Sequence, residues 1–290
     1  MANSIALAKN YTSILDEVYK NASVTADLTS DNTMVRAGAN ANEIVYPQIS
    51  VNGLGDYSRN SGYTGNAVNL EWKTATFNYD RGTKIAVDVM DNEESRDIAF
   101  TMAGSELMRT KVAPEADAFV FATLAGKTGI SKATPVTYAD ATAFLTALIE
   151  AKNKMDEDEV PEEGRILYAT PTLLNGVMAL DTTKSREVLA TFSKTVKVPQ
   201  SRFYTAIDLL DGKTTGEEAG HYRKATTGKD INFMIVHKPA VIKFDKHTAS
   251  NIIPASANPD ADADISKYRK YGIVDVFANK VAGIYLSHKE

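Results

Sequence analysis

The sequence has 290 residues, of which 43% are hydrophobic and 24% charged, and its formal net charge at pH 7 is -5. This is an ordinary globular composition, and the mild negative charge argues against a surface that neutralises nucleic acid. The absence of cysteine excludes disulfides, thiolate nucleophiles and the usual structural zinc sites. No apolar run is long enough to span a membrane and residues 1–20 carry no secretory signal, so we expect a chain that folds in the cytoplasm.

Residues 4–20 show the first regular pattern. Apolar residues, including Tyr11 and Leu15, recur there at spacings of three and four, which places them on one face of a short helix. This face could dock on its own domain or belong to an arm that packs on a neighbouring subunit. In the second case Tyr11 and Leu15 are candidate intersubunit contacts.

Residues 37–84 have the alternating texture of β-structure. Two extended arms, 43–51 and 68–79, flank a tip at 52–66 that is rich in Gly, Asn, Ser and Tyr. Such residues form turns and polar contacts but cannot fill a core. The pattern predicts a long hairpin of roughly 30 to 40 Å, and because an isolated hairpin is marginal in water, the arm must lie on something else.

Four residues of this hairpin are candidate intersubunit contacts, namely Tyr57, Tyr63, Leu70 and Trp72. Trp72 is the sole tryptophan of the chain and lies near Leu70 on the returning strand. Local packing would explain it, but tryptophan is also enriched at protein interfaces.

A long helix is predicted from Asp91 to Gly126. Asp91 and Glu94 have the spacing of a capping pair, and Pro114 should kink or divide the helix. If continuous, it would be about 50 Å long, at about 1.5 Å per residue. A helix of this length has more surface than one small core can cover. We therefore expect part of it to pack on another layer of the fold or on another subunit.

The next part of the chain mixes helices and strands. Thr137 and Asp140 resemble a second capping pair, followed by a helix with a buried stripe from Phe144 to Met155. Further predicted elements are a strand at 165–169, a helix at 171–180 and strands at 231–237 and 241–244. Residues 266–287 predict two long strands around a turn at Asn279, which would give a second sheet. The mixed order indicates an α+β fold.

No catalytic, cofactor or metal motif is coherent in the sequence. None of the four histidines has the spacing of a paired metal ligand. The acidic run at 156–159 reads as a solvated turn more readily than as a metal site. Asp260, Asp262 and Asp264 alternate as in a calcium loop, but Ile265 replaces the turn glycine. We therefore predict a protein that is not an enzyme and has no cofactor, catalytic residue or metal site.

The order of these elements resembles the major capsid proteins of tailed bacteriophages, which have the Hong Kong 97 fold. The stretches that carry the resemblance are KIAVDVMDNEE at 84–94, VPEEGRILYATP at 160–171, IVHKPAV at 235–241 and DVFANKVAGIY at 275–285. Each motif is weak alone, and the resemblance rests on their joint order across essentially the whole chain.

The resemblance implies an N-terminal arm at 1–36, an extended E-loop at 37–84, a peripheral domain with the spine helix at 85–135 and 240–290, and an axial domain at 136–239. It further implies pentamers and hexamers that form an icosahedral phage head around double-stranded DNA, with only weak or indirect DNA contact. Scaffolding and portal proteins would be partners, and no membrane would be involved. The protein would be located in the virion after synthesis and assembly in the host bacterial cytoplasm.

Two alternatives remain open at this level. An encapsulin-like nanocompartment shell would share the fold but enclose an enzyme cargo. A non-catalytic ligand-binding protein is the other alternative, although a sugar-binding module would need clustered aromatic residues, and here they are spread along the chain.

Overall fold

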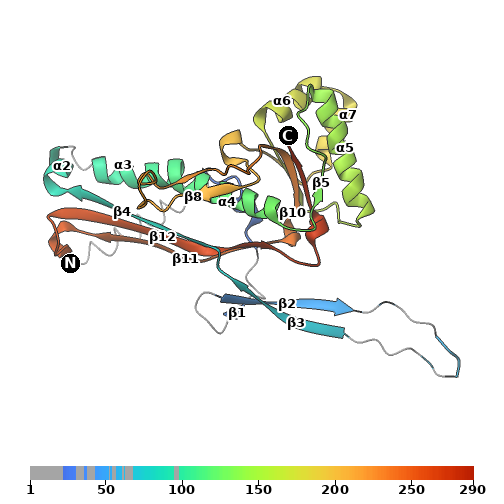
Figure 1. Ribbon diagram of the computed structural model, residues 1–290, viewed down its shortest axis with the longest axis horizontal. Helices are drawn as coiled ribbons and strands as arrows, with labels where there is room; N and C mark the ends of the chain where they lie inside the picture. Colours follow the sequence, from blue (N-terminus) through green and yellow to red (C-terminus); the bar gives the residue numbers. More distant parts are fainter. Residues whose placement is uncertain are drawn as a thin grey trace.

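The computed structural model describes residues 22–30, 36–37, 43–51, 53, 57–60, 62, 68–94 and 98–290. Within these residues the strands form four sheets. Figure 1 shows a hairpin that projects from the body, a long sheet with helices along one face, and a part built on five strands. Helices and strands are mixed along the chain, which confirms the predicted α+β class.

The hairpin consists of β2 (Glu43–Val51) and β3 (Val68–Thr76), which pair antiparallel along their full length. The short β1 (Arg36–Ala37) pairs with β2. The first arm has the predicted bounds, but the second ends at Thr76 instead of Tyr79. Tyr79 already belongs to the next strand, where its ring is buried and lies 5.0 Å from the ring of Phe119.

The long sheet has the strand order β11-β12-β4, with β4 at Tyr79–Asp88, β11 at Val241–Ile253 and β12 at Ala263–Val276. β11 continues well beyond Phe244, where the sequence pattern predicted its end. A register shift between Asp245 and His247 lets it stay paired with β12 over its whole length.

Helices follow β4 directly: α2 (Val89–Glu94), α3 (Ile98–Leu107), a π-helix (Met108–Val112) and α4 (Ala113–Gly126). The predicted start at Asp91 is wrong, because α2 begins at Val89. The carboxylate of Asp88, three residues before Asp91, accepts a hydrogen bond from the backbone N–H of Met90 at 2.9 Å and caps the helix. Pro114 lies in the first turn of α4. It has no N–H to donate, and the π-helix just before it accommodates that loss without ending the helical path.

The third part is a five-stranded sheet in the order β5-β13-β10-β6-β7. Its strands are β5 (Ser131–Lys132), β6 (Arg165–Ala169), β7 (Lys194–Lys197), β10 (Ile231–His237) and β13 (Ile284–His288). The predicted strands at 165–169 and 231–237 are confirmed. A further pair, β8 (Ile207–Leu209) and β9 (Tyr222–Lys224), forms a two-stranded sheet.

Three helices accompany this sheet: α5 (Ala141–Glu157), α6 (Pro171–Leu180) and α7 (Thr183–Ala190). The predicted helix at 171–180 is confirmed. The cap of α5 is Asp140 and not Thr137, since an Asp140 carboxylate oxygen accepts from the backbone N–H of Ala143 at 2.7 Å. Phe144 and Met155 are fully buried, as the predicted stripe requires.

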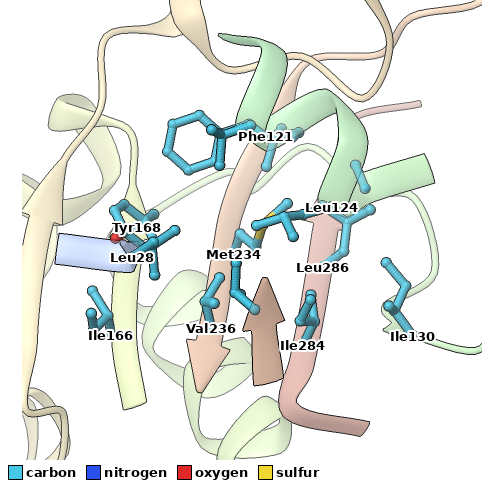
Figure 2. Close-up of a cluster of buried hydrophobic side chains, with 14 of the residues drawn as sticks. Leu28, Phe121, Leu124, Ile130, Ile166, Tyr168, Met234, Val236, Ile284 and Leu286 are labelled. Carbon is cyan, nitrogen blue, oxygen red and sulfur yellow. The ribbon is translucent and has the colours of Figure 1, made fainter. Parts of the chain in front are cut away.

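The five-stranded sheet is covered on both faces. On one face, Phe144 and Leu148 of α5 pack with Phe233 of β10. On the other face, Phe121 and Leu124 of α4 pack with residues of the same sheet, as Figure 2 shows. Strands that are buried on both faces read as continuous apolar runs, which is why β6 and β10 were recognisable in the sequence.

The C-terminal residues contain two strands as predicted, but these strands do not pair with each other. β12 lies in the long sheet and β13 in the five-stranded sheet. Their burial patterns differ accordingly: β12 has exposed side chains at Lys267 and Arg269, whereas Ile284 to Ser287 of β13 are all buried. The chain therefore changes sheet at the turn around Asn279.

Candidate functional site

The two faces of the hairpin differ sharply in chemistry. Pro47 lies opposite Trp72 and Ile49 lies opposite Leu70 in the β2–β3 register, and residues directly opposite in an antiparallel pair share a face. Together with Val45, these four residues form a stripe that we call the apolar face.

The apolar face is exposed to an unusual degree. Ile49 is 58% exposed, Leu70 50% and Trp72 44%. Six large hydrophobic side chains are exposed in the described part of the chain, and Tyr57 at 62% joins these three as a fourth on the hairpin. A contiguous exposed apolar surface in a soluble protein marks an interaction site.

The opposite face of the hairpin is polar toward its far end. Lys73 forms an ion pair with Glu71 at 3.3 Å, and the Asn69 side-chain amide donates to Glu71 at 3.0 Å. These groups are compatible with water, so the free-energy cost of exposure is concentrated on the apolar face alone.

The base of the hairpin is anchored to the long sheet. Ile44 and Tyr46 are buried beside Ile273 of β12, and the Tyr46 ring meets the edge of Phe277 at 5.2 Å. Burial, helped by the Asp275 carboxylate, raises the pKa of Tyr46. The far part of β2 and β3 runs away from the body on the side where α5 lies (Figure 1). The molecule thus holds the hairpin at its base and presents the apolar face outward.

The structure places three of the six candidate contacts. Leu70 and Trp72 share the apolar face, and Tyr57 is exposed near the tip. Tyr11, Leu15 and Tyr63 lie outside the described residues, so they stay predictions.

Sequence reasoning missed Ile49, the most exposed member of the apolar face. The signal was present, because Val45, Pro47, Ile49 and Val51 occupy alternate positions of one strand and must share a face once the strand forms.

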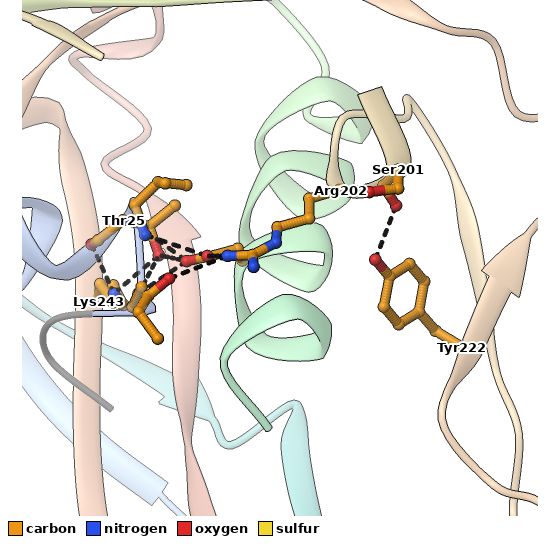
Figure 3. A network of polar contacts seen from close by, with 9 residues as sticks. Thr25, Ser201, Arg202, Tyr222 and Lys243 are labelled. Atoms are coloured by element: carbon orange, nitrogen blue, oxygen red, sulfur yellow. Dashed lines mark hydrogen bonds and ion pairs between the residues drawn. The ribbon is translucent and has the colours of Figure 1, made fainter. Parts of the chain in front are cut away.

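The start of the described chain is tied down by a buried polar network (Figure 3). Asp117 of α4 is fully buried, and its carboxylate accepts hydrogen bonds from Ser23 Oγ at 2.7 Å and from Thr25 N and Oγ1 at 3.1 and 2.7 Å. Arg202 Nη1 donates to the same carboxylate at 3.1 Å and to the backbone oxygen of Ala22 at 2.9 Å. One carboxylate therefore joins residues 22–25, which belong to the predicted N-terminal arm, to α4 and to the segment before β8.

Lys243 of β11 completes this network. Its Nζ donates to the backbone oxygen of Thr25 at 2.6 Å and to Thr25 Oγ1 at 3.1 Å. The side chain is only 4% exposed. Burial, reinforced by the nearby Lys270 ammonium, lowers the pKa of Lys243 to about 8, although Asp245 and Asp117 oppose the shift.

The Lys243 pKa predicts a pH-dependent stability. The folded pKa of about 8 lies below the ordinary 10.5, so between these values the unfolded chain binds more protons. The free energy of unfolding of the wild type should therefore rise with pH in this window relative to Lys243→Met, by up to roughly 1 kcal/mol per pH unit. Urea denaturation of the unassembled subunit at pH 7.5, 8.5 and 9.5, followed by circular dichroism, measures this. Parallel pH profiles for the two proteins would contradict the assignment.

The described residues offer little to bind a metal. No group of three or more histidine and carboxylate side chains in the described part could hold an ion. In the acidic run at 156–159, Asp156 pairs with Arg165 at 2.7 Å and Asp158 with Lys154 at 2.5 Å. Asp264, from the calcium-like alternation, accepts from the backbone N–H of Ala255 at 2.9 Å. Across the same described residues, none of the helices is both long and apolar enough to cross a membrane.

Solved structures share this fold over nearly the whole chain. The capsid structure of cyanophage P-SCSP1u superposes with a TM-score of 0.58 at 16% identity, covering 93% of this chain and 88% of that one. The mature capsid of bacteriophage PhiM1 gives a TM-score of 0.58 at 13% identity, covering 86% and 82%. A virus-like particle from Pyrococcus furiosus gives a TM-score of 0.58 at 10% identity, covering 95% and 96%. No protein-family model and no curated protein matches the sequence.

Proposed function

We propose that this chain, which has the fold of phage capsid proteins, is the major capsid protein of a tailed bacteriophage or prophage. In this proposal it self-assembles into pentamers and hexamers that form an icosahedral head around double-stranded DNA. The observation that carries the proposal is the apolar face of the hairpin, with Ile49, Leu70 and Trp72 about half exposed on a projecting arm.

The parts of the structure take capsid roles in this proposal. Residues 1–36 form the N-terminal arm and 37–84 the E-loop, of which 79–84 lie in β4 of the long sheet. Residues 85–135 and 240–290 form the peripheral domain, in which α3, the π-helix and α4 are the spine helix. Residues 136–239 form the axial domain, to which β13 contributes a strand from the C-terminal part.

Assembly follows from the direction of the hairpin. An arm that projects to one side and buries its apolar face on the next copy makes a head-to-tail contact. Such contacts repeat around a ring and close it when the rotation permits, which produces the capsomers. Full burial of a large apolar side chain contributes about 1.5 to 3 kcal/mol, so covering three side chains that are about half exposed supplies a few kcal/mol to each contact.

Partners and location follow from the same proposal. Scaffolding and portal proteins would act during assembly in the host bacterial cytoplasm, and the mature protein would reside in the virion. A net charge of -5 leaves only weak or indirect contact with packaged DNA. The role is structural and not enzymatic.

Purified full-length protein tests this proposal. Sedimentation velocity and electron microscopy should show closed, regular particles containing many copies of the chain. A protein that remains monomeric at micromolar concentration, under all salt and pH conditions in which it stays folded, would refute a shell function.

A nanocompartment shell of the encapsulin type is the second candidate, favoured by the likeness to the virus-like particle from Pyrococcus furiosus. The content of particles isolated from the native host separates the two. DNA that is protected from nuclease identifies a phage head, whereas a co-purifying protein cargo without DNA identifies a nanocompartment.

A further inference from the structure

A pair of lysines faces each other on the long sheet. Lys84 of β4 lies directly opposite Lys267 of β12, and both side chains are exposed. Like charges directly opposite in an antiparallel pair are destabilising. Neither lysine forms an ion pair with another described residue.

Among the described residues, the strand positions around the pair supply no counter-charge. The third residue in the same row, on β11, is Asn251. The neighbouring rows on this face are Ala249, Arg269 and Gly82 on one side and Ile253, Ile265 and Ala86 on the other. None of these seven residues is acidic, and Arg269 adds a third cation.

The carboxylates closest along the strands are already engaged. Asp80 receives hydrogen bonds from Arg269 at 2.9 and 2.7 Å, and these bonds lower its pKa. Asp88 caps α2 through the N–H of Met90. Arg269 therefore has a carboxylate partner, whereas Lys84 and Lys267 have none among the described residues.

The lysine face of the sheet is the one that α3 and α4 do not cover. Tyr268, adjacent to Lys267 and hence on the opposite face, packs with Met108 and Ala116 of the helical layer. On the lysine face, the base of the hairpin covers Ile273 through Ile44 and Tyr46. The pair thus lies exposed on a face whose other end is already a contact surface.

The chain also carries unpaired charges of the opposite sign. The last residues of α5 and the turn that follows, residues 156–163, contain six carboxylates, and we call this segment the acidic turn. Asp156, Asp158 and Glu162 pair with basic neighbours. Glu157, Glu159 and Glu163 are exposed and have no ion pair with another described residue.

These complementary charges form no ion pair with each other within one subunit. In Figure 1, α5 lies on the side toward which the hairpin points, whereas β4 leads to α2 at the opposite end of the molecule. A head-to-tail contact between copies brings these two sides together.

We propose that Lys84 and Lys267 form a carboxylate-binding site for the acidic turn of a second copy of this chain. The inference rests on the proposed shell function and assigns it a second, electrostatic contact besides the hairpin. It explains why the sheet retains a like-charge pair that costs stability in the isolated subunit.

A single substitution gives a diagnostic pair of results. Lys84→Thr removes the repulsion and introduces a residue that favours strands, so the unassembled subunit should melt roughly 1 to 2 °C higher. Under the same conditions the yield of closed particles should fall several-fold. If Lys84 had only a structural role, its substitution would not raise the stability of the subunit and lower the particle yield at the same time. A lower melting temperature or an unchanged particle yield would overturn the inference.

Reversing the charges on both sides tests whether the acidic turn is the partner of the two lysines. Lys84→Glu with Lys267→Glu, and separately Glu159→Lys with Glu163→Lys, should each reduce particle yield at least tenfold, and their combination should restore it. Lys184→Glu with Lys197→Glu is the matched control with the same change of charge. Loss without restoration in the combined variant would overturn the acidic turn as the partner. If the wild type itself forms no particles, the proposed function fails, whereas normal particles from all variants refute this contact alone.

Discussion

Replacement of both Leu70 and Trp72 by serine should leave the subunit folded and abolish closed particles. The two side chains are about half exposed, so the isolated subunit loses little when they are removed. An assembled contact would lose the burial of their exposed halves, on the order of 1.5 to 3 kcal/mol for each hairpin. Circular dichroism melting should therefore change by less than about 3 °C, while sedimentation velocity shows only small species.

The matched control for this prediction lies on the other face of the same strand. Glu71→Ser with Lys73→Ser removes an ion pair between two half-exposed side chains and leaves the net charge unchanged. Such exposed pairs contribute at most about 1 kcal/mol, so this variant should still form particles. If the Leu70 and Trp72 variant formed normal particles, the apolar face would not be part of the assembly contact.

Asp117→Ala should reduce the free energy of unfolding by about 3 to 5 kcal/mol, the largest effect on stability that we expect from a single polar residue. The substitution removes a buried acceptor from Arg202, from the Ser23 hydroxyl, and from the N–H and hydroxyl groups of Thr25. Breaking a buried charge pair by removing one partner has this magnitude. Urea denaturation of the unassembled subunit measures it.

An exposed ion pair provides the comparison. Asp208 and Arg223 lie 3.3 Å apart with side chains 45% and 59% exposed, so Asp208→Ala should change the free energy of unfolding by less than about 1 kcal/mol. If Asp117→Ala costs no more than Asp208→Ala, the network around Asp117 does not hold residues 22–25 in place.

Elements with a strong local signal could be predicted closely. Residues 165–169 and 231–237 are apolar runs that stay buried on both faces of a covered sheet, and both strands have the predicted bounds. The helix Pro171–Leu180 begins with a proline, which suits the first turn of a helix. In these segments the local preference and the tertiary environment agree.

Features that depend on partners distant in the sequence were missed. The predicted pair of C-terminal strands is divided between two sheets because β12 pairs with β11 and β4, whereas β13 joins β10. Two residues compete for each helix cap, and only the backbone decides that Asp88 and Asp140 accept the hydrogen bonds. The π-helix before Pro114 has no sequence pattern of its own.

The sequence predicted that the hairpin carries apolar contact residues, but it did not identify all of them. Trp72 and Leu70 stood out as apolar residues on a strand, yet their common face with Ile49 required the register of β2 against β3. The network around Asp117 was not foreseen at all, because its donors lie about ninety residues away in the chain.

The most direct measurement of the central claim uses the absence of cysteine from the sequence. Ile49→Cys introduces a single thiol at the most exposed position of the apolar face, and its rate of reaction with a maleimide can be compared between unassembled subunits and purified particles. We expect rapid labelling of the subunit, at least tenfold slower labelling in the particle, and full recovery after the particle is dissociated. Equal labelling rates in subunit and particle would show that no second copy covers this face.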